Sequence, residues 1–224
     1  MPNMIFEGVR ILLEVDEKYI QIDDVDDATL RRIWPGLVAE YPGFTVDFCY
    51  HNNAAPIAFF KEINAVLEDD CIELHLNNRD LPNIPVSGVV VITESNFDCF
   101  AIIHDQKNPD MYWTSAKLRK DLSGWDILAI MDGNAVSGSA FIRSGWEVYA
   151  LYTESSKNML TLLNAVVRRG FATLAQKTPA IEREILFNVA RDEHMQLEAA
   201  LKLGFRCTGY YIGYTAKTSG TSPQ

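Results

Sequence analysis

The sequence has few cysteines, and none of them is arranged to bind a metal. Four cysteines are scattered through 224 residues, with no C-x-x-C pair and no histidine at the spacing of a zinc site. We therefore expect no metal centre. Single cysteines spaced in this way are typical of buried, reduced thiols in a cytoplasmic protein.

The sequence also lacks the features that bring a protein to a membrane or to nucleic acid. No apolar run approaches the roughly 20 residues needed to cross a bilayer. The first 15 residues have no basic segment ahead of an apolar one, as an export signal has. The formal net charge of −10 repels the phosphates of nucleic acids and of anionic lipids. We expect a cytoplasmic protein with neither partner, and a cationic acceptor such as an amine is favoured electrostatically.

The remaining composition is that of an ordinary globular protein, with 48% hydrophobic and 22% charged residues. The strongest linker signal is 81–85, where two prolines within four residues stop both helix and sheet. It divides the chain into a small α/β subdomain over 1–85 and a larger α/β domain over 86–216. Residues 217–224 are polar and are predicted to form a disordered tail.

The N-terminal subdomain shows alternating strand and helix patterns. Residues 9–15 and 19–22 predict strands. Four aspartates within 23–27 precede apolar residues at helical spacing, but the glycine and the glutamate of a calcium-binding loop are missing. These carboxylates are therefore interpreted as the start of a helix, which Pro35-Gly36 and Pro42-Gly43 should break or end. A second helix is predicted over 58–67 and another strand over 71–76.

The larger domain starts with a strand, two helices and a hairpin. Its first elements are predicted over 88–93 (strand), 94–104 (helix), and 125–130 and 135–142 (strands). Between them, 111–118 leads into a second helix up to Leu122, with Thr114 or Ser115 as its N-cap. Asp132-Gly133-Asn134 between the last two strands is a strong hairpin signal, because the turn requires a positive φ.

The stretch from Trp146 to Tyr214 says most about function. It predicts a strand (146–153), a helix ending near 175, a strand (184–189), a helix (193–203) and an aromatic strand (209–214). The sequence KLGFRCTGYY, from Lys202 to Tyr211, resembles the KLGF…GYY ending of the GNAT superfamily of acyl-CoA-dependent N-acyltransferases. With this order of elements, the resemblance covers 86–214. It implies a mixed, mostly antiparallel sheet with splayed central strands and flanking helices. The first 85 residues would fit a degenerate partial copy, although no sequence repeat is clear enough to assert one.

The resemblance implies transfer of an acyl group from acetyl-CoA, as co-substrate, to an amine of a small molecule or peptide. In the family, a loop written Arg/Gln-x-x-Gly-x-Gly/Ala holds the pyrophosphate at a helix N-terminus. Here the matching segment, 154–159, has no glycine. Its side chains could cap the helix or contact phosphate. The candidates for cofactor binding, including backbone donors of the fourth strand, are Leu151, Tyr152, Thr153, Ser155, Ser156, Lys157, Asn158, Met159 and Glu193.

For catalysis, the resemblance points to Glu147 as general base, on the strand face that alternation assigns to Tyr149, Leu151 and Thr153. An exposed strand-end glutamate is the alternative interpretation. The family's tyrosine acid is replaced by Ala200. Tyr210 and Tyr211 on the following strand could replace it, or could be packing residues.

These departures from the family pattern leave a second hypothesis. The protein could be a catalytically inactive GNAT-fold binding or regulatory protein, paired with another subunit. A homodimer is equally open from the sequence. Binding of CoA distinguishes the enzyme from the inactive protein.

Overall fold

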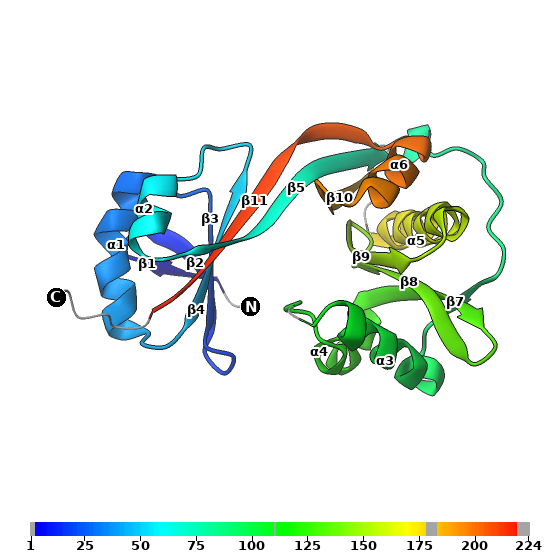
Figure 1. The fold of residues 1–224 in the computed structure, drawn as a ribbon, viewed down its shortest axis with the longest axis horizontal. Helices are drawn as coiled ribbons and strands as arrows, with labels where there is room; N and C mark the ends of the chain where they lie inside the picture. The colour runs from blue at the N-terminus through cyan, green and yellow to red at the C-terminus, as the bar shows by residue number, and fades with distance from the viewer. Residues whose placement is uncertain (1–2, 110, 178–182, 219–224) are drawn as a thin grey trace. The chain divides into compact units, whose positions relative to one another are not determined.

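The computed structural model describes residues 3–109, 111–177 and 183–218. They divide into two compact units, whose elements are labelled in Figure 1. Unit 1 comprises the described residues of Met1–Ile72 and Gly209–Gln224, and unit 2 comprises those of Glu73–Thr208. The first unit is therefore built from both ends of the sequence. The predicted linker at 81–85 lies within unit 2.

Unit 1 is a sheet with its helices on one face (Figure 1). Its strand order is β1-β2-β3-β4-β11-β5, with β3 and β4 parallel and the β1–β2, β2–β3 and β4–β11 pairs antiparallel. The elements are β1 (Asn3–Phe6), β2 (Val9–Glu14), β3 (Tyr19–Asp23), α1 (Asp27–Glu40), β4 (Thr45–His51), α2 (Ile57–Glu62), and the parts of β5 (Val66–Asn77) and β11 (Arg206–Lys217) that belong to this unit. The predictions of β2 and β3 are confirmed, whereas β1 and β4 were not predicted.

The start of α1 confirms the interpretation of the aspartate cluster. The Asp26 side chain accepts a hydrogen bond from the Thr29 N–H at 2.8 Å. Of the two predicted breaks, Pro42-Gly43 is confirmed, because α1 ends at Glu40, whereas Pro35-Gly36 lies inside the helix and does not end it. Leu30 and Leu37 are fully buried on either side of the proline. Packing of this apolar stripe therefore outweighs the hydrogen bond that the proline cannot make.

The second predicted helix ends early. α2 stops at Glu62, and the chain is already in β5 from Val66. Asn64 has a φ of 54°, in the left-handed region, and the Ala65 N–H closes back onto the Phe60 carbonyl at 2.8 Å. A left-handed residue of this kind terminates a helix, which is why the strand begins within the range predicted as helix.

Unit 2 has the strand order β5-β10-β9-β8-β7-β6. The pairs β6–β7, β7–β8 and β8–β9 are antiparallel, and β9–β10 is parallel. α3 and α4 cover one face of the sheet and α5 covers the other (Figure 1). The elements are β6 (Val89–Val91), α3 (Phe97–Lys107), α4 (Ser115–Lys120), β7 (Trp125–Asp132), β8 (Ala135–Arg143), β9 (Glu147–Thr153), α5 (Ser156–Lys177), β10 (Glu184–Ala190), α6 (His194–Lys202), and single 3₁₀ turns at Asn78–Asp80, Glu94–Asn96 and Leu122–Gly124. This mixed, mostly antiparallel sheet with flanking helices confirms the predicted fold class.

The order of element types repeats along the chain. In unit 1, β1, β2 and β3 are paired antiparallel, and α1 leads to the parallel strand β4, followed by α2 and β5. In unit 2, β7, β8 and β9 are paired antiparallel, and α5 leads to the parallel strand β10, followed by α6 and β11. The N-terminal region thus has the element order of the second half of unit 2.

Two polar side chains of α5 fix the extended segment at 81–85. Asn164, which is fully buried, donates from Nδ2 to the Ile84 carbonyl at 2.9 Å. Arg168 donates to the Pro82 carbonyl at 2.6 Å and to the Asn164 Oδ1 at 3.0 Å. Side-chain donors therefore replace the sheet or helix partners that this proline-rich segment lacks.

Residues 217 and 218, which were predicted to belong to the tail, are part of unit 1. Lys217 ends β11 and pairs with Thr45, and Thr218 is fully buried. The Phe44 N–H donates to the Thr218 hydroxyl oxygen at 2.8 Å, and the Gly43 N–H donates to the Thr218 carbonyl at 3.0 Å. The rest of the predicted tail, 219–224, lies outside the described residues.

The four cysteines differ in their burial. Cys49 and Cys71 are buried, Cys99 is half-buried and Cys207 is exposed, so the prediction of burial holds for two of the four. None of the described helices has the length and apolarity needed to span a membrane.

Candidate active site

The two central parallel strands of unit 2 pair only at their beginnings. The β9–β10 register contains Glu147 with Leu186 and Val148 with Phe187, although both strands continue for several residues. Beyond these pairs, the side chain of Gln196 on α6 reaches β9 and donates from Nε2 to the Leu151 carbonyl at 3.1 Å. The central strands therefore splay, as predicted from the sequence.

The backbone carbonyl of Leu151 lies on the part of β9 that is not paired with β10. In an antiparallel ladder the N–H and the C=O of one residue face the same neighbour. The Leu151 carbonyl accepts from Gln196 of α6, and by this rule its N–H lies on the same side of β9. This N–H is one of the donors that the sequence assigned to the acyl group.

A β-bulge in β9 changes which side chains share a face. Phe141 pairs with Ala150 and Ile142 pairs with Val148, so Tyr149 is an extra residue. The prediction that Glu147, Tyr149, Leu151 and Thr153 share one face is therefore wrong. Tyr149 packs with the aromatic core beneath α3, whereas Thr153 packs with Gly138 and with Leu162 of α5. Strict alternation of side chains fails at a bulge, which the sequence pattern does not reveal.

Glu147 lies in a row of residues that crosses the sheet. Trp125 on β7 is in register with Arg143 on β8, Arg143 with Glu147 on β9, and Glu147 with Leu186 on β10. The Tyr149 hydroxyl interacts with the side chains of both Glu147 and Arg143. Burial, together with the negative charge of Glu147, raises the pKa of Tyr149 above its ordinary value, so this tyrosine stays protonated.

Aromatic rings surround Arg143 in this row. Its guanidinium lies 4.4 Å from the ring centroid of Trp113 and 5.5 Å from that of Trp125. The Trp125 ring in turn contacts Trp113 at 5.0 Å and Tyr149 at 5.1 Å between centroids. We call Arg143, Trp113, Trp125 and Tyr149 the arginine cage. No spacing within the sequence points to this cage, because only the folded arrangement of the strands brings its members together.

The segment predicted to hold pyrophosphate caps its own helix. The Asn158 N–H donates to the Ser155 hydroxyl oxygen at 3.4 Å, so Ser155 is the N-cap of α5. Ser156 and Lys157 occupy the first two helical positions, whose N–H groups have no acceptor within a helix. The sequence left open whether these side chains cap the helix or contact phosphate. The hydrogen bond to Ser155 shows capping for that residue.

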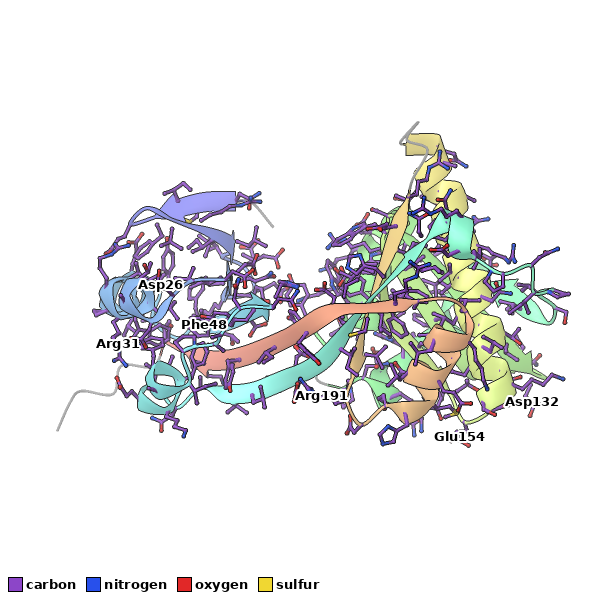
Figure 2. The ribbon with its side chains drawn as sticks, turned by 90° about the horizontal axis from the view of Figure 1, so that it is seen from above. Asp26, Arg31, Phe48, Asp132, Glu154 and Arg191 are labelled. Carbon is purple, nitrogen blue, oxygen red and sulfur yellow. The ribbon has the colours of Figure 1, made fainter. Side chains whose placement is uncertain are left out.

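Glu154 is exposed at the end of β9 (Figure 2) and accepts a hydrogen bond from the Tyr152 hydroxyl at 2.9 Å. Lys107, at the end of α3, lies 4.6 Å from the Tyr152 ring centroid. Its hydrogen bond to Tyr152 and the nearby charge of Glu154 raise the pKa of Lys107. Lys107 is therefore a second cation beside this segment, in addition to Lys157. No motif in the sequence pointed to it.

The structure separates the remaining candidates. Met159 is buried in α5, and Glu193 is the N-cap of α6 without a side-chain cap hydrogen bond. Tyr210 and Tyr211 belong to unit 1, whereas the other candidates belong to unit 2. The Tyr211 hydroxyl lies 3.2 Å from the Cys49 Sγ, and burial raises its pKa.

His104 supports the loop that carries Trp113. It is 1% exposed on α3, stacks on Phe100 at 5.1 Å and donates from Nε2 to the Trp113 carbonyl at 2.7 Å. Burial lowers its pKa. A depressed pKa means that the folded state binds fewer protons than the unfolded state, so stability is full above the unfolded pKa and is lost as pH falls.

We expect the free energy of unfolding to fall between pH 7.5 and 5.5 because of His104. A histidine that remains neutral in the folded state costs at most about 1.4 kcal/mol at pH 5.5, given an unfolded pKa of about 6.5. Urea unfolding of the native protein and of His104→Gln at both pH values measures this cost. The native protein should lose more stability than the variant. Equal losses would assign the pH dependence to other groups.

Comparison by sequence identifies no relative of this chain. No family model matches it, and neither does any curated protein.

Comparison of structures does find similar proteins. A tandem GNAT protein from the clavulanic acid biosynthesis pathway matches with a TM-score of 0.56 and 12% identity, over 96% of this chain and 79% of that chain. A GCN5-related N-acetyltransferase from Kribbella flavida matches with a TM-score of 0.54 and 15% identity, over 96% and 89% of the two chains. A conserved protein of unknown function from Staphylococcus epidermidis matches with a TM-score of 0.63 and 9% identity, over 93% and 90%.

These likenesses, together with the splayed strands, define the fold as that of the GNAT superfamily. At 9 to 15% identity the shared feature is the fold. The chain has this fold, and the similarity extends over nearly its whole length, including the N-terminal region.

Proposed function

We propose that the protein is an acyl-CoA-dependent N-acyltransferase that uses acetyl-CoA. The observation that carries this proposal is the early end of the β9–β10 ladder on the strand that begins with Glu147. The splay leaves the Leu151 N–H and C=O without a strand partner on that side. These groups can hold an extended acyl-pantetheine chain by backbone hydrogen bonds. The hydrogen bond from the Gln196 side chain to the Leu151 carbonyl must break first.

The anionic end of the donor would lie at the start of α5. The N–H groups of Ser156 and Lys157 and the positive end of the helix dipole favour a phosphate there. The charges of Lys107 and Lys157 would replace the electrostatic contribution of the family's arginine. The negative charge of Glu154 repels an anion at this site. The hydrogen bond from the Tyr152 hydroxyl keeps the Glu154 carboxylate beside the positive charge of Lys107.

In the proposed reaction, Glu147 accepts a proton from the acceptor amine. The nitrogen then forms a bond to the thioester carbon, the carbon–sulfur bond breaks, and CoA leaves as a thiolate that takes up a proton. The products are an amide and free CoA. A donor N–H at Leu151 would stabilise the oxygen on which negative charge develops during the attack.

Thermal unfolding with and without acetyl-CoA tests this function. A ligand present at 100 times its dissociation constant stabilises by about 2.7 kcal/mol, which corresponds to a rise in Tm of about 5 to 10 °C for a chain of this size. Free CoA should give a similar rise. Pantetheine lacks the phosphates and should give a smaller one. The absence of any shift at millimolar acetyl-CoA would contradict the proposal.

One observation favours a second candidate, a GNAT-fold binding protein without catalysis. Ser155 already satisfies one N–H group at the proposed phosphate site, and Glu154 places a negative charge beside it. If neither acetyl-CoA nor CoA shifts Tm, this candidate replaces the enzyme.

A further inference from the structure

Arg143 forms no ion pair with a carboxylate among the described residues, whereas Arg31, Arg119 and Arg169 each form one with an aspartate. Arg143 is half-buried, lies against aromatic rings and interacts with Tyr149, which also interacts with Glu147. A guanidinium removed from water in this way is stabilised by an anion. The arginine cage therefore has the chemistry of a site for an anionic group.

A second donor in the cage also lacks an acceptor. Trp125 is 6% exposed, and its Nε1 is buried without any hydrogen-bond partner in the described structure. A buried N–H left unpaired costs stability, so a partner is expected when a ligand binds. Trp125 is the register neighbour of Arg143. An oxyanion in the cage could accept hydrogen bonds from both residues.

The opposite side of the same row offers acceptors. Glu147 is the register neighbour of Arg143 on β9. Asn188, on β10, lies two residues beyond Leu186 and therefore on the same face of the sheet. Like the Trp125 Nε1, the Asn188 Oδ1 is buried and has no hydrogen-bond partner among the described residues. Donors lie on β7 and β8, and acceptors on β9 and β10. This polarity is complementary to a molecule with a carboxylate at one end and an amine at the other.

We propose that the acceptor is an amino acid, with its carboxylate bound by Arg143 and the Trp125 Nε1, and its amine held at Glu147 and the Asn188 Oδ1. This inference rests on the proposed acyl transfer and names its substrate class. A simple amine is a poor alternative, because its ammonium would pair with Glu147 and leave the guanidinium of Arg143 without an anion. The carboxylate of an amino acid supplies that anion. It also brings the amine to Glu147 on the adjacent strand, about 5 Å away.

The first test compares each of the twenty amino acids with its α-amide as acceptor, with acetyl-CoA as donor and mass spectrometry as readout. The two members of each pair differ only in the negative charge. We expect the preferred amino acid to have a KM about 10- to 100-fold lower than its amide, the range for hydrogen bonds to a charged group. Equal or better transfer to the amides would overturn the proposal while leaving the acyltransferase intact.

Variants of the cage test the assignment of residues. Arg143→Met should raise KM for the amino acid by about 10- to 100-fold without changing KM for its amide or for acetyl-CoA. Trp125→Phe keeps the ring and removes only the N–H, so it should raise KM less. Arg119→Met is the matched control, because Arg119 also stacks on an aromatic ring, Phe97, but is paired with Asp98. If Arg119→Met and Arg143→Met have the same effect, Arg143 is structural and the assignment fails.

A binding experiment separates this inference from the activity. Each N-acetylated amino acid and its amide are titrated into the native protein and into Arg143→Met by calorimetry, without CoA. Binding of an acid form but not of its amide, lost in Arg143→Met, supports the site even if no turnover is found. If no acid form binds the native protein more tightly than its amide, the site is disproved. A Tm shift with acetyl-CoA in the same preparation would show that the proposed function survives.

Discussion

Replacing Glu147 with glutamine should lower kcat for acyl transfer by about 10²- to 10⁴-fold, the usual contribution of a general base. The amide keeps the size of the side chain and the interaction with Tyr149 but cannot accept the proton from the amine. We expect Tm and KM for acetyl-CoA to change little, since the cofactor contacts lie further along β9. Steady-state kinetics of the purified variant, with release of CoA as the readout, measures the effect.

Glu184→Gln provides the control for this prediction. Glu184 is an exposed carboxylate at the start of β10, where an oxygen lies 3.4 Å from the His75 Nδ1. Its replacement should leave kcat within about twofold, as expected for a surface substitution that costs less than about 0.5 kcal/mol. Loss of activity only in Glu147→Gln supports the base. Retention of full kcat in Glu147→Gln would assign deprotonation to another group or to solvent.

A chain that ends at Thr208 should lose the fold of unit 1. β11 contributes seven register pairs to β4, from Tyr211 with His51 to Lys217 with Thr45. Tyr214 and Ala216 also pack into the core beneath α1 and α2. Without these residues β4 loses a neighbouring strand, and a small sheet core with an open edge is not expected to remain folded. Hydrogen exchange over 3–72 should be fast in the shortened chain.

A chain that ends at Thr218 is the control. It keeps all seven β4–β11 pairs and the hydrogen bonds of Thr218 with Phe44. We expect its exchange rates over 3–72 to match those of the full chain. Slow exchange in the chain ending at Thr208 would mean that unit 1 folds without β11, which would contradict the prediction.

The sequence predicts the fold best where local signals and packing agree. The strands and helices between 88 and 203 were placed correctly, because apolar periodicity, the Gly133 turn and the Gly204 stop all act locally. It fails where tertiary contacts override a local signal. Pro35 remains inside α1 because the residues on both sides of it are buried, and Asn64 ends α2 by a backbone conformation that its residue type permits but does not require.

The candidate site was predictable only in part. Glu147 and the segment 154–159 could be found because both lie in the stretch that resembles a known family. Which side chains of β9 share a face with Glu147 could not be predicted, because the bulge at Tyr149 depends on the pairing of β8 with β9. Arg143, Trp125 and Asn188 could not be found either. Their relation exists only in the register of four strands, and no spacing within the sequence encodes it.

The N-terminal region repeats the element order of the second half of unit 2, which we interpret as a partial copy of the GNAT fold. Each stretch has three antiparallel strands, a helix, a parallel strand, a short helix and a long last strand. The tandem GNAT protein, which aligns with 96% of this chain, supports that interpretation. Unit 1 lacks counterparts of α3 and α4 among its described residues, so it would be an incomplete copy.

The assembly of unit 1 from both ends of the chain has a consequence for synthesis on the ribosome. Unit 2 is continuous in sequence, so it can fold as soon as Thr208 has emerged, whereas unit 1 also requires β11 beyond that residue. During that interval β4 has an unpaired edge, and closing the sheet requires contacts between residues about 170 positions apart. Such high contact order slows folding. The nascent N-terminal region is therefore the part of this protein most in need of a chaperone.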